Sequence, residues 1–151
     1  MKSPFLIATV SVIAAIAFLV YAVPLIKRLL RGKADYIDPK DLDARLKAHE
    51  DMLMIDIRKE FNDPMLGYIN GSVSLPFDRF LSRIAQTADE LAGFKDVPVV
   101  IIGLRDENDV FRAYQCLKNK GFKKVSILNY GITQWLRVGL PTVRLHVEEK
   151  A

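Results

Sequence analysis

The hydrophobic pattern separates one long uncharged segment at the start of the chain from shorter apolar runs further on. Residues 4–26 read PFLIATVSVIAAIAFLVYAVPLI, without a charged side chain. A helix of that length, rising about 1.5 Å per residue, would cross a hydrocarbon core about 30 Å thick. Cleaved signal peptides have shorter apolar cores and small residues at the cleavage zone, where this chain has the bulky run Phe18 to Tyr21. The pattern therefore predicts a retained transmembrane helix over residues 4–26, in contact with the lipid bilayer.

Basic residues follow this segment directly. Four of the seven residues in KRLLRGK, from Lys27 to Lys33, are Lys or Arg, whereas the other flank offers Lys2 and the terminal amine. The more basic flank of a single span usually stays in the cytoplasm. The sequence thus predicts a single-pass inner-membrane protein with its C-terminal part in the cytoplasm, joined to the span by a basic juxtamembrane linker, residues 27–36.

The same basic residues account for the positive net charge. The chain has 22 Lys and Arg against 18 Asp and Glu, a formal net charge of +4. Without the five basic residues of the first 33 positions, 17 remain against 18 acidic residues, so residues 34–151 carry a formal charge of −1. Nucleic-acid binding is not expected, because no basic excess is left to neutralise phosphates.

Strand and helix signals alternate from residue 37 onward. Asp38 and Pro39 are typical of a helix start, with an N-cap oxygen and a proline at the first helical position, and predict a helix over about 39–48. The compact apolar runs MLMIDI, VPVVIIG and KKVSILN predict buried strands. Two helical stretches between them end at Gly93 and Gly121, which are natural C-caps. These signals predict an α/β fold with a parallel sheet covered on both faces.

The order of these elements resembles the rhodanese-like domains over nearly all of residues 37–141. The segments IDPKDLDARLK, MLMIDIRKEFN, GYINGSVSLP and GFKKVSILNYGITQWLRVGLP follow the family's order and spacing, with Tyr68 in place of a common His and Ser74 in place of a common Asn. The resemblance implies a three-layer domain over residues 37–145, with a central parallel sheet flanked by helices, followed by a tail, residues 146–151. The glycines of GYINGSVSLP permit turns, Pro76 ends a strand, Trp135 covers the core and Gly139 closes the last helix.

Active members of this family carry sulfur on a cysteine in the loop that follows the central strand and precedes a helix, and that loop typically starts Cys-Arg. A thiolate there is stabilised by the helix dipole and by converging backbone N–H groups. In this chain Arg105 matches the arginine best, which leaves Leu104 at the nucleophile's place; a shift of one residue offers Gly103 instead. Neither residue can carry sulfur, so no catalytic residue is predicted.

Cys116 is the single cysteine of the chain. It lies about three helical turns beyond Leu104, roughly 15 Å or more from the strand end, and falls in the interior of the predicted helix. We interpret it as a small half-buried core residue, with a redox-sensitive thiol as the alternative.

The loop itself is the candidate binding site. It comprises seven residues, several of them charged: Gly103, Leu104, Arg105, Asp106, Glu107, Asn108 and Asp109. Its carboxylates would cap the helix start and repel an anionic substrate. Beyond that capping role, the loop could recognise a basic or polar protein partner.

Other chemistry has little support in the sequence. His49 and His146 are remote from each other and from the cysteine, so no zinc site is predicted, and no glycine-rich phosphate loop is present. No cofactor is expected. Asp56 and Arg58 match an acid and an arginine frequent in the family, where they would hold adjoining loops through polar contacts.

Together these features favour a membrane-anchored, non-catalytic rhodanese-like module that acts in protein interaction or scaffolding at the cytoplasmic membrane face. The alternative is an enzyme, either a sulfurtransferase that uses Cys116 after rearrangement or an unrelated activity in the same pocket.

The basic cluster gives a test of the predicted orientation. A reporter enzyme that is active only in the cytoplasm should be active when it is fused after Ala151. Neutral replacements of the four basic residues from Lys27 to Lys33 should give a mixture of orientations. Activity of a periplasmic reporter at the same position would contradict the predicted topology.

Overall fold

The computed structural model describes residues 16–22, 34–87 and 89–144. The chain divides into two compact units, residues 1–33 and residues 34–151. In the first unit, a π-helical turn covers Phe18–Ala22. Within the described ranges no helix is both long and apolar enough to span a membrane. Most of the predicted span, residues 4–26, and the tail, residues 146–151, lie outside these ranges, so both stay predictions.

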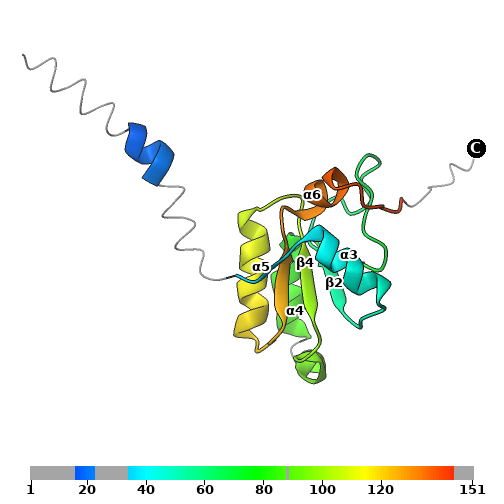
Figure 1. Cartoon of the computed structure of the whole chain (residues 1–151). Helices are drawn as coiled ribbons and strands as arrows, with labels where there is room; N and C mark the ends of the chain where they lie inside the picture. Colours follow the sequence, from blue (N-terminus) through cyan, green and yellow to red (C-terminus); the bar gives the residue numbers. More distant parts are fainter. Residues whose placement is uncertain (1–15, 23–33, 88, 145–151) are drawn as a thin grey trace, which may run out of the picture. The chain divides into compact units, whose positions relative to one another are not determined.

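A parallel sheet forms the centre of the second unit (Figure 1). Its described strands are β1 (Tyr36–Ile37), β2 (Leu53–Asp56), β3 (Val73–Ser74), β4 (Val99–Ile102) and β5 (Val125–Leu128), in the order β1-β5-β4-β2-β3. In the central pair Leu53 lies opposite Val99 and Asp56 opposite Ile102. The three predicted strands are confirmed as the middle of the sheet. A strand was also expected before Pro76, where β3 lies, whereas β1 was not predicted.

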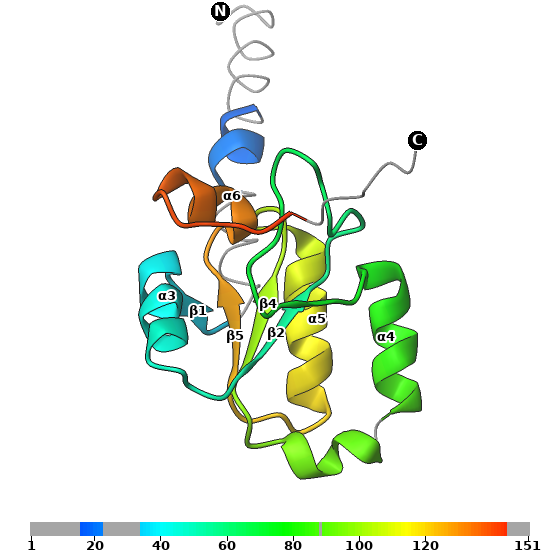
Figure 2. The same cartoon turned by 90° about the vertical axis from the view of Figure 1, so that its right-hand side faces the viewer.

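Helices cover both faces of this sheet, as Figure 2 shows. On one face lie α4 (Phe77–Gln86) and α5 (Asn108–Asn119); on the other lie α3 (Pro39–Lys47) and α6 (Gly131–Arg137). A short 3-10 helix, η2, covers Glu90–Phe94. The predicted α/β fold with a central parallel sheet between helices is therefore confirmed.

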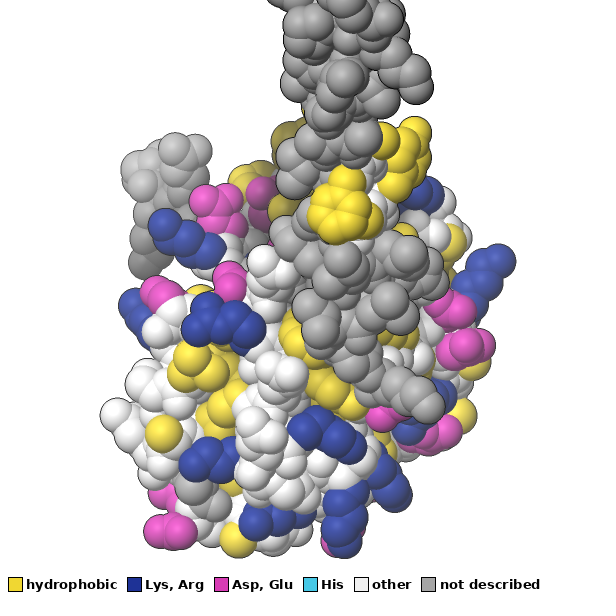
Figure 3. All heavy atoms as spheres, turned by 90° about the vertical axis from the view of Figure 1, so that its left-hand side faces the viewer, with side chains coloured by type: hydrophobic (Ala, Val, Ile, Leu, Met, Phe, Trp, Pro, Cys, Tyr) yellow, Lys and Arg dark blue, Asp and Glu magenta, His cyan; other side chains and the backbone are white. Residues whose placement is uncertain are grey.

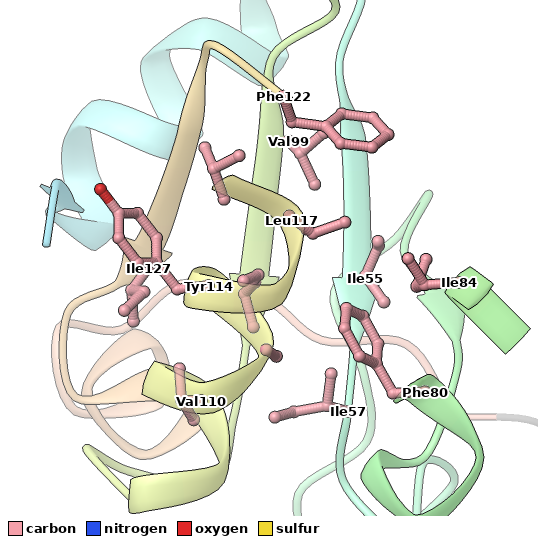
Figure 4. Packing of buried hydrophobic residues seen from close by; sticks show 13 residues of the cluster. Ile55, Ile57, Phe80, Ile84, Val99, Val110, Tyr114, Leu117, Phe122 and Ile127 are labelled. Carbon is pink, nitrogen blue, oxygen red and sulfur yellow. The ribbon is translucent and has the colours of Figure 1, made fainter. Parts of the chain in front are cut away.

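Alternation along β4 supplies both hydrophobic clusters. Val99 and Ile101 belong to the cluster under α4 and α5, whereas Val100 and Ile102 belong to the cluster under α3 and α6. Figure 4 shows the first cluster, where Phe80 of α4 and Leu117 of α5 point toward the strands. Full burial of side chains of this size stabilises the fold by about 1.5 to 3 kcal/mol each. Trp135 is 2% exposed, which confirms its predicted place over the core.

Local signals for turns were mostly read correctly. Gly67, Gly71, Gly121 and Gly139 all have positive φ angles, and α3 spans nearly the predicted range. Pro76 follows the end of β3 by two residues and is the N-cap residue of α4. Its main role is therefore at the start of the helix.

Two local predictions are wrong. The helix expected to run to Gly93 ends at Gln86, where the Thr87 hydroxyl donates to the carbonyl of Arg83, and Gly93 falls inside η2. The Asp38 side chain makes no cap to α3, because its Oδ1 accepts a hydrogen bond from Asn129 Nδ2 at 2.8 Å instead.

Charges on the domain are mixed. On the face shown in Figure 3, Lys and Arg side chains are interspersed with Asp and Glu side chains over the described surface. This distribution agrees with the near-zero formal charge of residues 34–151.

Candidate functional site

The loop that follows β4 lies at the carboxyl edge of the parallel sheet, where α/β proteins commonly bind ligands. Gly103 is buried at the end of the strand, and Leu104 is 39% exposed. A Cβ atom on Gly103 would collide with Cγ2 of Val110 in α5. Position 103 therefore has no room for a side chain, and position 104 is the first in the loop from which one can reach solvent.

The start of α6 holds the back of this loop. The amide of Ile132 donates to the carbonyl of Gly103 at 2.9 Å, and the hydroxyl of Thr133 donates to the carbonyl of Leu104 at 2.7 Å. Gly131, with φ of 55°, approaches Gly103 so closely that a Cβ would collide with its carbonyl oxygen. These contacts fix the loop backbone against the sheet.

Glu107 does not cap α5, although it occupies the N-cap position. Its backbone is extended and its side chain makes no cap hydrogen bond. Instead, Oε1 accepts a hydrogen bond from the amide of Arg105 at 3.1 Å. The prediction that this carboxylate binds the free N–H groups of the helix is therefore wrong. Glu107 accepts a hydrogen bond from a backbone amide of the loop.

The other two acids of the loop, Asp106 and Asp109, contact side chains of other residues. Oδ1 of Asp109, in the first turn of α5, lies 3.8 Å from Nη1 of Arg112. Oδ1 of Asp106 accepts a hydrogen bond from the Tyr36 hydroxyl at 3.5 Å, which links the loop to β1.

A buried ion pair stands next to the loop, at the carboxyl end of β2. Nη2 of Arg58 lies 2.7 Å from Oδ2 of Asp56, and Nε lies within 3.0 Å of both carboxylate oxygens. Nη2 also donates to the carbonyls of Phe61 and Gly67, so the pair ties the segment after β2 to the sheet. This confirms the predicted role of the two residues in holding adjoining loops.

The ion pair is almost completely buried, and this affects the pKa of Asp56. The side chains of Asp56 and Arg58 are 0% and 5% exposed. Burial raises the pKa of Asp56, and the hydrogen bonds and charge of Arg58 oppose that shift. Nη1 of Arg58 is buried and has no hydrogen-bond partner within the described part of the chain.

A cavity of about 570 Å³ opens between the segment after β2, the start of α4 and the β4–α5 loop. Three of the seven predicted loop residues line it, Leu104, Glu107 and Asp109; the other four do not. The remaining lining residues come from the other two segments: Ile57, Arg58, Lys59, Glu60, Asp63, Leu66, Pro76, Phe77 and Asp78.

Most of those residues were not predicted as site residues. A usable signal existed, because the carboxyl ends of neighbouring parallel strands meet at one edge of the sheet, and β2 and β4 are neighbours. The segments following MLMIDI and VPVVIIG should therefore face one another across the cavity.

Cys116 lies apart from this cavity. It is half-buried in α5, packed against the cluster that α5 shares with α4, and it is not among the cavity's lining residues. It follows the first residue of α5 by eight positions, about 12 Å along the helix. Burial raises the pKa of its thiol, which disfavours the reactive thiolate. The predicted half-buried core position is confirmed.

Comparisons with known proteins agree with the geometry. The family model of the rhodanese-like domain matches residues 38–137. A sulfurtransferase from Allochromatium vinosum is 33% identical over 107 residues, which are 71% of this chain and 92% of that relative.

Solved structures are similar over most of the domain. A crystal structure of a protein from Anabaena sp. is 26% identical, covers 73% of this chain and 82% of its own, and superposes with a TM-score of 0.60. A rhodanese-related protein from Thermoplasma volcanium is 25% identical, with coverage of 72% and 97% and a TM-score of 0.54.

The buried pair gives a quantitative prediction. Arg58→Ala leaves the Asp56 carboxylate buried without its cation and should lower the free energy of unfolding of the full chain by about 3 to 5 kcal/mol. Without Arg58, burial holds the pKa of Asp56 still further above its unfolded value, so the stability of the variant should fall as pH rises through the range between the two pKa values.

Denaturant unfolding at several pH values measures both effects. Arg105→Ala, which removes an exposed arginine nearby, is the control and should change stability by no more than about 0.5 kcal/mol. A loss for Arg58→Ala as small as that of the control would show that the pair does not organise this edge of the sheet.

Proposed function

The chain belongs to the rhodanese-like domain family, and on that premise we propose that it is a non-catalytic member that binds a protein partner through the β4–α5 loop and the adjoining cavity. In the same proposal, residues 4–26 hold the domain at the cytoplasmic face of the inner membrane. The anchor rests on the uncharged segment and the basic flank of the sequence.

One observation carries the non-catalytic part of the proposal. By the family resemblance the nucleophile's place is Leu104, which lines the cavity, and no cysteine is among the lining residues. A methyl-bearing side chain cannot form a persulfide, and it adds apolar surface at the mouth of the cavity. Partially exposed apolar surface next to charged residues is typical of protein contacts.

Sulfur transfer is the second candidate, because the relative from Allochromatium vinosum that is 33% identical is named a sulfurtransferase. In this chain the reaction would need Cys116 as the sulfur carrier. Cys116 would have to leave the hydrophobic cluster and travel about two turns of α5 to reach the loop. Such a movement would disrupt the packing of α5 against the sheet, and we therefore favour the binding role.

Two measurements on the full chain test this proposal. We expect no thiosulfate-to-cyanide turnover above buffer, whereas Leu104→Cys serves as the positive control for a thiol at the loop position. We also expect capture of a partner from membranes to weaken severalfold when Leu104 is changed to Ser or Arg105 to Ala, while stability changes by no more than about 0.5 to 1 kcal/mol.

Asp51 is exposed and precedes β2, at the amino ends of the strands and away from the cavity. Asp51→Asn should therefore leave capture unchanged. Turnover by the unmodified chain, or equal capture by all of these folded variants, would refute the proposed role of the loop.

A further inference from the structure

The cavity beside the loop combines an apolar lining with an excess of negative charge. Apolar atoms come from Ile57, Leu66, Pro76, Phe77 and Leu104, and carboxylates come from Glu60, Asp63, Asp78, Glu107 and Asp109. Lys59 and Arg58 are the basic residues of the lining. The charge of Arg58 is compensated by Asp56 at 2.7 Å, and that of Asp109 is partly compensated by Arg112 at 3.8 Å. The other four carboxylates of the lining face one cation, Lys59.

Two of the carboxylates already use backbone donors that an anionic ligand would need. Glu107 Oε1 accepts from the amide of Arg105 at 3.1 Å. Asp63 Oδ1 accepts from the amides of Met65 and Leu66 at 2.7 and 2.9 Å, and these hydrogen bonds lower the pKa of Asp63. An anion entering the cavity would have to displace these side chains and would be repelled by the others.

A cation is already accommodated at the edge of this cavity. The guanidinium of Arg112 lies 5.1 Å from the centre of the Phe77 ring, and its Nη1 lies 3.8 Å from Oδ1 of Asp109. Phe77 and Asp109 both line the cavity, whereas Arg112 does not. An arginine of the chain itself therefore uses two of the lining residues as a cation site.

Two other carboxylates remain available. Glu60 and Asp78 are exposed, and neither side chain forms a hydrogen bond or an ion pair within the described residues. These two acids can therefore pair with a basic group of a ligand.

We propose that the cavity takes a lysine or arginine side chain of a protein partner. The charged group lies among the carboxylates that include Glu60 and Asp78, and the aliphatic stem packs against Leu66, Phe77 and Leu104. This inference rests on the proposed partner-binding function and specifies its ligand: a basic residue in a peptide segment, opposite in charge to the anions on which sulfur transfer acts.

Small peptide probes test the charge and the stem separately. N-acetyl-arginine methylamide would be titrated into the ¹⁵N-labelled full chain in a zwitterionic detergent, with the amide signals of Leu66, Phe77 and Leu104 as the readout. N-acetyl-norleucine methylamide keeps the stem without the charge, and N-acetyl-glutamate methylamide reverses the charge. We expect the arginine probe to bind at least about fivefold more tightly than either of them, and to weaken when salt is added.

Variants of the unpaired carboxylates locate the site. Glu60→Gln and Asp78→Asn should each weaken the arginine probe severalfold without moving signals of the hydrophobic core, because both side chains are exposed. Asp51→Asn is the matched control and should bind like the unmodified chain. The inference is overturned if the glutamate or norleucine probe binds as tightly as the arginine probe. It is equally overturned if the arginine probe moves none of the three signals, or if the control weakens it as much as the cavity variants do.

These outcomes separate the ligand class from the function on which it rests. Partner capture that depends on Leu104, without binding of the arginine probe, would leave the partner-binding role standing and refute the basic ligand. Binding of the arginine probe without loop-dependent capture would support the basic ligand and refute the proposed role of the loop in partner binding.

Discussion

The buried pair of Asp56 and Arg58 is the interaction on which the architecture of the site depends. Asp56 ends β2, and the guanidinium that neutralises it also binds the carbonyls of Phe61 and Gly67. The backbone continues the same arrangement, because the carbonyl of Asp56 accepts from Leu75 and that of Ile57 accepts from Phe77. The charge pair thus fixes the segment after β2, these backbone hydrogen bonds fix the start of α4, and the first turn of α6 fixes the β4–α5 loop.

With its walls held in this way, the chemistry of the cavity is set by a few side chains. The rhodanese-like fold places a loop at a helix start, where backbone donors and the helix dipole favour anions. In this chain Leu104 stands where the family resemblance leads us to expect a thiol, and Glu107 accepts a hydrogen bond from the amide of Arg105. Under the proposed function, the scaffold is retained while its cavity favours a cation in place of an anion.

Much of the fold could be predicted from the sequence. Buried parallel strands have compact apolar sequences, and several helices are followed by a glycine. The run VPVVIIG gave β4, and Gly121, with φ of 91°, follows the last turn of α5 as expected. The break of α4 at Gln86 could not be predicted, since the hydrophobic pattern continues past it and the Thr87 side chain competes locally for a helix carbonyl.

Only the part of the site that is contiguous in the sequence could be predicted. The loop residues are contiguous, so Leu104, Glu107 and Asp109 could be named from one motif. Glu60 and Asp78 come from two other segments, and they meet the loop only through the strand order, in which β2 lies between β3 and β4. The contact of Glu107 with Arg105 also depends on a side-chain conformation that competes with an ordinary helix cap, and residue type does not decide between the two.

We infer that this domain retains the rhodanese-like scaffold without carrying sulfur. Intact-mass spectrometry of the full chain after incubation with thiosulfate tests it most directly, with an active thiosulfate sulfurtransferase treated in parallel. We expect an unchanged mass for this chain and the addition of one sulfur atom to the control. A gain of one sulfur atom that peptide mapping places on Cys116 would contradict it.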